Sequence, residues 1–360
     1  MWGVGACGVK GETAELTHLA RLARCAPRKP ARLKDNLRRM QAILAVTVPF
    51  FALVLCGYLA ARRQLLPESA IPGLNGFVLY FALPCLLFRF GAGTPVLELL
   101  NPAVLAVYLA SGLLIVFFTI ALTLNDRIQL PDAAFGALVA AFPNTGFMGV
   151  PLLVALLGNA AAGPLICTVL ADLFVTSSVC IALAQAHGGS GQGTRAAWMR
   201  ALRGALSNPL PWSIALGAAS SVSGVVLPGP LATLVGMLAD AASPVALFTI
   251  GAVLWRAGRH AAHRTPLADY LPLAMIKLAL HPLLVLALGA AAHALGAPLS
   301  AFQLTVLTLA AALPSASNVS LLAERYGADD GRVARIIMSS TVLAFGSFTL
   351  LAWALGVRPG

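Results

Sequence analysis

The sequence predicts an all-α integral membrane protein of about ten transmembrane helices, arranged as two inverted five-helix repeats with broken helices 4 and 9. Its composition, its internal repeat and two proline motifs inside apolar segments lead to this prediction. The 360 residues are 59% hydrophobic and 10% charged, with a mean hydropathy of +0.86. A soluble domain of this length cannot bury so much apolar surface in one core, whereas a lipid bilayer solvates it.

Ten segments are long and apolar enough to cross the roughly 30 Å hydrocarbon layer, which takes about 20 residues of helix. In chain order they are roughly Ala42–Ala61, Leu74–Phe90, Pro102–Leu124, Ala133–Leu157, Gly163–Ala186, Leu210–Val226, Leu231–Leu254, Tyr270–Ala294, Phe302–Leu322 and Val333–Gly356. We refer to them as spans 1 to 10. Their continuous apolar character does not fit the alternating pattern of a β-barrel.

The spans divide into two sets of five whose features recur in the same order. Residues 40–187 form the first repeat, residues 188–206 a polar linker and residues 207–360 the second repeat. Span 2 has Pro84 at its centre, and span 7 has Pro244 in the corresponding place. Because each half has an odd number of spans, the second half inserts upside down, as in many secondary transporters.

Spans 4 and 9 carry the motifs FPNTGFMGVPLL and LPSASNVSLLAE, each with a proline near mid-membrane. Proline removes a backbone donor and breaks the helix, and the polar residues that follow favour the start of a new one. Broken backbone at this depth survives where it lines a cavity, and the new helix N-terminus suits a carboxylate. The carbonyl groups left free at the end of the first half-helix can instead hold a cation. The alternative without a function is an ordinary proline kink in each helix. The predicted substrate-binding residues are Pro143, Asn144, Thr145, Pro314, Ser315, Ser317 and Asn318.

Four ionisable residues lie inside predicted spans, where charges are costly and are functional or paired. They are Asp172 in span 5, Asp240 in span 7, and Lys277 with His281 in span 8. An aspartate can carry a coupling proton, Lys277 can attract an anionic substrate or neutralise an aspartate, and His281 can titrate near neutral pH. The sequence predicts ion coupling or charge pairing for these four residues and leaves the division of roles open.

The distribution of positive charge predicts the orientation in the membrane. Twelve of the fifteen Lys and Arg residues after residue 39 fall in the loops that follow the odd-numbered spans. They are Arg62, Arg63, Arg127, Arg195, Arg200, Arg203, Arg256, Arg259, Arg264, Arg325, Arg332 and Arg335. The protein is expected in the inner (cytoplasmic) membrane with these loops on the cytoplasmic side. Both chain ends are then expected outside.

Residues 1–39 contradict that orientation, because they hold nine further Lys and Arg residues. We interpret this segment as a non-native extension or a disordered tail, with translation starting at Met40. The alternative is a basic cytoplasmic tail with a different topology, and the intact mass of the native protein distinguishes the two. Without the segment the net charge falls from +11 to +5, so the basic pI indicates no nucleic-acid partner.

Other function classes find little support in the sequence. No cysteine pair has the spacing of a metal or redox motif, so no metal site or cofactor is expected. The chain has no HExxH motif, no GxSxG motif and no paired aspartates within one span, which argues against a membrane-embedded enzyme. The adjacent Asp329 and Asp330 precede span 10 and are expected in a solvated loop. A passive channel or a sensor remains a further alternative.

The runs GFVLYFALPCLLF, FPNTGFMGVPLL and LPSASNVSLLAERYG resemble the auxin efflux carrier family, in its bacterial branch of malate- or malonate-permease-like transporters. The similarity covers essentially Met40–Gly356. It implies a crossover of two broken helices, with spans 1, 2, 6 and 7 forming a scaffold that makes a homodimer. Spans 3–5 and 8–10 would form a transport domain that moves like an elevator, with Asn144 and Asn318 in the substrate site.

The expected function is therefore secondary active transport of a small organic anion, a carboxylate such as malonate or malate, across the cytoplasmic membrane. The short linker at Gly188–Leu206 departs from the long hydrophilic loop of many plant members, which argues against auxin as the substrate. The coupling ion can be H⁺ or Na⁺. The alternative is a sodium-coupled symporter of the bile-acid type, which shares a similar inverted repeat, and sodium dependence discriminates between the two.

Overall fold

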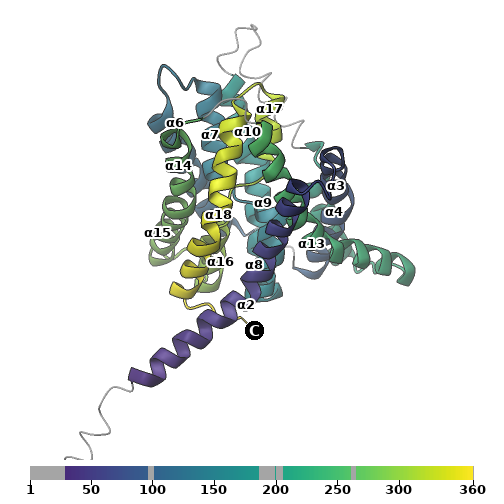
Figure 1. Ribbon diagram of the computed structural model, residues 1–360. Helices are drawn as coiled ribbons and strands as arrows, with labels where there is room; N and C mark the ends of the chain where they lie inside the picture. The colour runs from purple at the N-terminus through teal and green to yellow at the C-terminus, as the bar shows by residue number, and fades with distance from the viewer. Residues whose placement is uncertain (1–28, 96–100, 186–198, 200–205, 261–264, 360) are drawn as a thin grey trace, which may run out of the picture. The chain divides into compact units, whose positions relative to one another are not determined.

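The computed structural model describes residues 29–95, 101–185, 199, 206–260 and 265–359, and every regular element in these ranges is a helix (Figure 1). The chain divides into two units, residues 1–41 and 42–360. In the first unit, residues 29–41 are the start of helix α2. Most of the predicted N-terminal extension and nearly all of the linker lie outside the described residues.

The helices follow one another along the chain, with short 3-10 and π-helical pieces between or within them. Their bounds are α2 (Lys29–Arg62), η1 (Glu68–Ala70), α3 (Ile71–Phe77), η2 (Val78–Ala82), α4 (Leu83–Gly93), α6 (Pro102–Thr123), α7 (Leu130–Ala141), η3 (Thr145–Gly149), α8 (Val150–Leu157), η4 (Asn159–Ala161), α9 (Ala162–Ala171), η5 (Asp172–Thr176), α10 (Ser177–Gln185), α12 (Pro209–Ser223), α13 (Gly229–His260), α14 (Leu267–Met275), η6 (Ile276–Leu280), α15 (His281–Ala294), α16 (Ala301–Ala311), α17 (Val319–Arg325) and α18 (Asp330–Ala354).

Within the described residues, seven helical segments are long and apolar enough to cross a membrane. They correspond to predicted spans 1, 2, 3, 5, 7, 8 and 10. The other three predicted spans are shorter as helices. Spans 4 and 9 are each split into two pieces, and span 6 is the 15-residue helix α12, which ends where Gly224 takes a left-handed conformation. The chain is therefore a multi-pass membrane protein by its helices.

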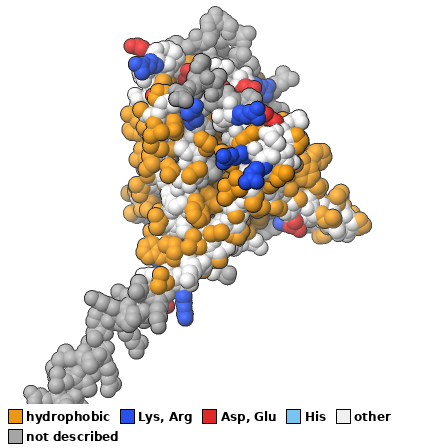
Figure 2. Space-filling view, in the orientation of Figure 1, with side chains coloured by type: hydrophobic (Ala, Val, Ile, Leu, Met, Phe, Trp, Pro, Cys, Tyr) orange, Lys and Arg blue, Asp and Glu red, His pale blue; other side chains and the backbone are white. Residues whose placement is uncertain are grey.

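The surface fits a lipid environment. On the face in Figure 2, hydrophobic side chains cover the middle, and charged side chains gather toward the end where α17 lies. Large apolar side chains such as Phe81, Phe117 and Leu350 are more than half exposed. Contiguous exposed apolar surface on this scale marks contact with membrane or protein in a folded chain.

The helix breaks predicted at the two prolines are present. Helix α7 ends at Ala141, two residues before Pro143, and α16 ends at Ala311, three residues before Pro314. Each proline lacks the N–H that would continue the helical ladder, so the chain leaves the helix there. Helical structure resumes at Thr145 in η3 and at Val319 in α17.

The second piece of each broken helix is followed by a glycine with a positive φ. Gly158 follows α8 with φ of 82°, and Gly327 follows α17 with φ of 72°. Glycine is favoured in this conformation because it has no Cβ. These two glycines open the loops GNAAAG and GADDG that mark the same place in the two predicted repeats.

Two pairs of glycines let helix backbones touch. A Cβ on Gly57 of α2 would collide with the Phe248 carbonyl of α13, and one on Gly251 of α13 with the Val54 carbonyl of α2. In the same way, Gly91 of α4 and Gly217 of α12 each face the backbone of the other helix. Close contact of this kind is typical of helix pairs in membranes, where small residues permit dense packing.

Arg332 joins three helices at one end of the bundle. Only 3% of this residue is exposed. Its Nε donates to the Asp269 carbonyl of α14 at 2.9 Å, and its Nη1 donates to the Asp132 carbonyl of α7 at 3.2 Å. The Asp132 carboxylate in turn accepts the N–H of Asp329 at 2.8 Å, while the Asp329 carboxylate caps α18. The prediction that Arg332 and Arg335 are loop residues is therefore wrong, because α18 starts at Asp330 and contains both, and the side chain of Arg332 turns inward.

Replacing Arg332 with alanine is expected to lower the free energy of unfolding by about 3 kcal/mol, since two backbone carbonyls then lose a charged donor. The melting temperature of the detergent-purified variant measures this. Arg325→Ala is the matched control, because Arg325 is exposed at the end of α17. Equal melting temperatures for the two variants would show that Arg332 does not hold these helices.

Candidate functional site

The two helix breaks lie against each other. The N–H of Asn144 donates to the Pro314 carbonyl at 2.8 Å, and the N–H of Ala316 donates to the Phe142 carbonyl at 3.0 Å. These bonds make an antiparallel bridge between Pro143 and Ser315. Each break thus satisfies backbone groups of the other, which is how non-helical backbone can persist inside a membrane protein.

Four polar side-chain atoms at this bridge have no hydrogen-bond partner within the described residues. They are Asn144 Oδ1, Thr145 Oγ1, Ser315 Oγ and Asn318 Oδ1. Asn144, Thr145 and Ser315 are at most 2% exposed. The sequence suggests that the residues after each proline cap the new helix, yet neither Asn144 nor Asn318 caps through its side chain. Their amides therefore remain free for a ligand.

A small cavity of about 20 Å³ adjoins the bridge. Its lining contains Asn144 and Asn318 together with the apolar Phe147, Leu173 and Leu210, and no ionisable side chain. A space of this size holds roughly one water molecule. A carboxylate substrate therefore requires these apolar side chains, including Leu210 of α12, to move away from the two asparagines.

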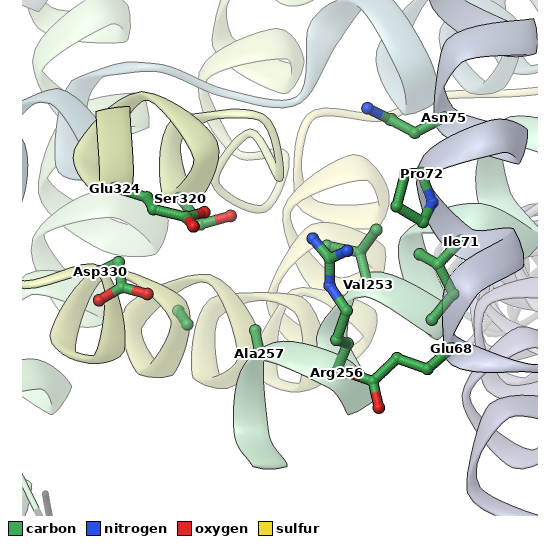
Figure 3. Close-up of a pocket in the computed structure, with 11 residues that line it drawn as sticks. Glu68, Ile71, Pro72, Asn75, Val253, Arg256, Ala257, Ser320, Glu324 and Asp330 are labelled. Carbon is green, nitrogen blue, oxygen red and sulfur yellow. The ribbon is translucent and has the colours of Figure 1, made fainter. Parts of the chain in front are cut away.

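A larger cavity of about 600 Å³ lies nearby but contains neither asparagine. In Figure 3, Ser320, Glu324 and Asp330 from α17 and α18 face residues of η1, α3 and α13 across it. Its lining is Glu68, Ile71, Pro72, Asn75, Val253, Arg256, Ala257, Ser320, Glu324, Asp330 and Ala334. With three carboxylates and one arginine in its lining, this cavity is unfavourable for an anion. We refer to it as the vestibule.

Asp172 is buried, with an exposed fraction of 1%. The Tyr108 hydroxyl of α6 donates to its Oδ2 at 2.8 Å, and the Thr176 hydroxyl donates to its Oδ1 at 3.1 Å. Both carboxylate oxygens therefore have donors. The carboxylate also interacts electrostatically with Lys277.

Lys277 and His281 are both fully buried. The Lys277 ammonium donates to the carbonyl of Ala311, the last residue of α16, at 2.6 Å and lies 3.2 Å from Nδ1 of His281. The His281 ring lies 6.0 Å from that of Tyr108, centroid to centroid. The structure thus brings three of the four predicted ionisable residues into one network that reaches the broken helix of span 9.

Asp240 lies outside this network. It forms an ion pair with Arg89 of α4 at 2.7 Å, and the two side chains are 72% and 47% exposed. An exposed pair contributes little to stability, typically below about 1 kcal/mol. The sequence placed Asp240 with the other ionisable residues, but the fold assigns it a partner on a neighbouring helix.

Sequence reasoning missed Tyr108 and Thr176. Tyr108 was detectable as a phenol inside an apolar span, because a buried hydroxyl requires a partner. Thr176 was detectable as the residue four positions after Asp172 on a helix.

Three of the four π-helical turns in the described residues also hold or adjoin candidate residues: η3 follows Asn144, η5 begins at Asp172 and η6 contains Lys277. Such turns are frequent at functional sites. No cluster of three or more metal-binding side chains occurs in the described residues.

The comparisons with known proteins identify a family of transporters. The profile of the membrane transport protein family matches residues 42–353. A Rhizobium meliloti (strain 1021) protein, provisionally named a malonate transporter, is 31% identical over 319 residues, which are 88% of this chain and 97% of that protein. The uncharacterized transporter YfdV of Escherichia coli (strain K12) is 28% identical over 285 residues, covering 78% of this chain and 87% of YfdV.

An uncharacterized transporter of Methanothermobacter thermautotrophicus is 27% identical over 318 residues, 86% of this chain and 96% of its own length. All three relatives are named as transporters, which agrees with the absence of enzyme motifs from the sequence. The match covers both helix breaks and the buried network. This chain therefore belongs to the membrane transport protein family, the auxin efflux carrier family, and is a membrane transporter.

Proposed function

We propose that the protein is a secondary active transporter of a small carboxylate such as malonate, which binds at the bridge between the two helix breaks. The observation that carries this proposal is the set of unpartnered polar atoms on Asn144, Thr145, Ser315 and Asn318. Each buried polar atom without a partner costs about 1–3 kcal/mol. A carboxylate can accept hydrogen bonds from the hydroxyls of Thr145 and Ser315 and from the Nδ2 groups of the two asparagines. The two Oδ1 atoms accept, so they pair with a donor such as a bound water or the hydroxyl of a protonated acid, and a bound ligand thus recovers part of this free energy.

The local charge also suits a carboxylate. The cavity has no acidic side chain in its lining. The helical segment of η3 and α8 starts at Thr145, so its N-terminal end faces the bridge with partial positive charge. The hydroxyls of Thr145 and Ser315 can each donate a hydrogen bond to a carboxylate oxygen. The name of the Rhizobium relative supports malonate as the first acid to test.

The proposed architecture is ten spans in two inverted repeats of five. Gly57 of α2 and Gly217 of α12 are 160 residues apart in the sequence. Gly91 of α4 and Gly251 of α13 are also 160 residues apart, so each pair occupies matching positions in the two proposed repeats. The proposed repeat makes α12 the counterpart of α2, and α13 the counterpart of α4. The close contact of α2 with α13 therefore has its counterpart in the close contact of α12 with α4. This regularity supports a scaffold of spans 1, 2, 6 and 7.

The remaining spans, 3–5 and 8–10, would form the moving transport domain. The vestibule supports this division, because η1, α3 and α13 line one side and α17 and α18 line the other. Movement of one side against the other would open Asn144 and Asn318 to alternate faces of the membrane, as in an elevator mechanism. The arginine-rich loops would lie in the cytoplasm.

The scaffold is also the proposed site of homodimer formation. Its Arg89–Asp240 pair is exposed in the single chain. Charged groups facing lipid are unfavourable. Covering by a second copy of the chain would shield the pair from hydrocarbon.

Uptake into proteoliposomes tests the proposal. Labelled malonate, malate and indole-acetate are offered with and without a proton gradient, in sodium or potassium buffer. We expect saturable uptake of a short carboxylate, malonate first, that exceeds leakage into protein-free liposomes. Absence of uptake of every acid under every gradient, by protein shown to be folded, would contradict a carboxylate substrate.

A further inference from the structure

Within the described residues, the last carbonyl of helix α16, that of Ala311, has no backbone hydrogen-bond donor. The carbonyls of Thr308, Leu309 and Ala310 accept from the N–H groups of Ala312 and Leu313. For Ala311, the residue three positions on is Pro314, which has no N–H. The residue four positions on, Ser315, donates its N–H to the hydroxyl of Ser340 at 3.2 Å. The sequence of the break therefore leaves the Ala311 carbonyl without a backbone partner.

The side chain of Lys277, from η6, supplies the missing hydrogen-bond donor. Its ammonium donates to the Ala311 carbonyl at 2.6 Å. The other groups around it are Nδ1 of His281 at 3.2 Å and the carboxylate of Asp172, with which it interacts electrostatically. The C-terminal end of α16 also carries partial negative charge. The ammonium thus sits among a carbonyl oxygen, an imidazole nitrogen and a nearby anion.

In transporters with broken helices, carbonyl groups at half-helix ends coordinate coupling cations. In this chain the ammonium group of Lys277, a cation that is part of the protein itself, occupies the equivalent position at the end of α16. We propose that Lys277 takes the place of a coupling sodium ion and makes the carrier independent of sodium. Sodium-independent transport rests on the proposed transport function, but the occupation of the cation position by Lys277 can be tested without any substrate.

The first test is the melting temperature of the purified wild-type protein in sodium, potassium and choline chloride at equal ionic strength. Wild type is expected to melt at the same temperature in all three salts, because no vacant cation site needs filling. Saturable stabilisation of wild type by sodium alone would overturn the proposal. This outcome is independent of whether malonate is the substrate.

The second test removes the ammonium with Lys277→Ala. The variant is expected to melt several degrees lower in choline, and to recover in a saturable way with sodium or with methylammonium, which replaces the missing group. Lys277→Arg keeps the charge and is expected to show no cation response, and Arg325→Ala controls for loss of an exposed cation. A Lys277→Ala protein that melts like wild type and ignores cations would overturn the proposal. If this variant cannot be purified, sodium-independent melting of wild type still supports the proposal and sodium-specific stabilisation still overturns it.

Discussion

Replacing Asn144 with alanine is expected to reduce saturable malonate uptake at least about 100-fold while the protein stays folded. Asn144 lines the cavity at the bridge, and its Oδ1 has no partner among the described residues. Removing this side chain therefore breaks no side-chain hydrogen bond among the described residues, but it removes the two N–H donors of the amide Nδ2 that can bind a carboxylate. Two charge-assisted hydrogen bonds of about 1.5 kcal/mol each give this loss, since 1.4 kcal/mol is tenfold in affinity. Initial uptake rates in proteoliposomes measure it.

Asn159→Ala is the matched control, because Asn159 is exposed in η4 beyond the end of α8. It is expected to transport like wild type. Asn318→Ala should reproduce the Asn144 result, since both amides line the same cavity. Normal uptake by both cavity variants would place the substrate elsewhere, and a melting temperature far below that of wild type would assign Asn144 a structural role.

Replacing Gly251 with valine is expected to lower the melting temperature by at least about 10 °C or to prevent folding. A Cβ at this position collides with the Val54 carbonyl and lies 2.6 Å from the Tyr58 nitrogen, both of which are backbone atoms of α2. Backbone atoms cannot turn aside as a side chain can, so α2 and α13 must separate. Thermal unfolding in detergent, followed by intrinsic fluorescence, measures the effect.

Gly236→Ala in the same helix is the control, because a Cβ there meets no atom within 4 Å. Alanine is the better helix former by about 1 kcal/mol, so this variant is expected to be as stable as wild type or more stable. If both variants melt like wild type, the close contact between α2 and α13 does not contribute to the fold.

The membrane class, the helix breaks and the loop glycines follow from local sequence. Composition alone requires a bilayer, because no core of this size could bury so many apolar residues. Pro143 and Pro314 end their helices wherever the rest of the chain lies, since the missing N–H is a property of the residue. Gly158 and Gly327 adopt positive φ for a similarly local reason.

Helix lengths were less predictable. In the part of the chain that the structure describes, seven segments meet the length needed to cross a membrane, whereas the sequence suggested ten. Hydropathy averages over a window and does not register that a proline divides one apolar run into two short helices. By hydropathy spans 4 and 9 are single apolar segments, whereas their prolines predict the break that divides each into two shorter helices in the structure.

The partners of the polar side chains depended on tertiary structure. Lys277 and Ala311 are 34 residues apart, Tyr108 and Asp172 are 64 apart, and Asp132 and Arg332 are 200 apart. The sequence identified Asp172 and Lys277 because charges inside apolar spans are costly wherever they occur. It identified Asn144 and Asn318 because they follow the helix-breaking prolines Pro143 and Pro314. Which group satisfies each one is decided by helix packing, since donors and acceptors far apart in the chain meet only when the helices that carry them are in contact.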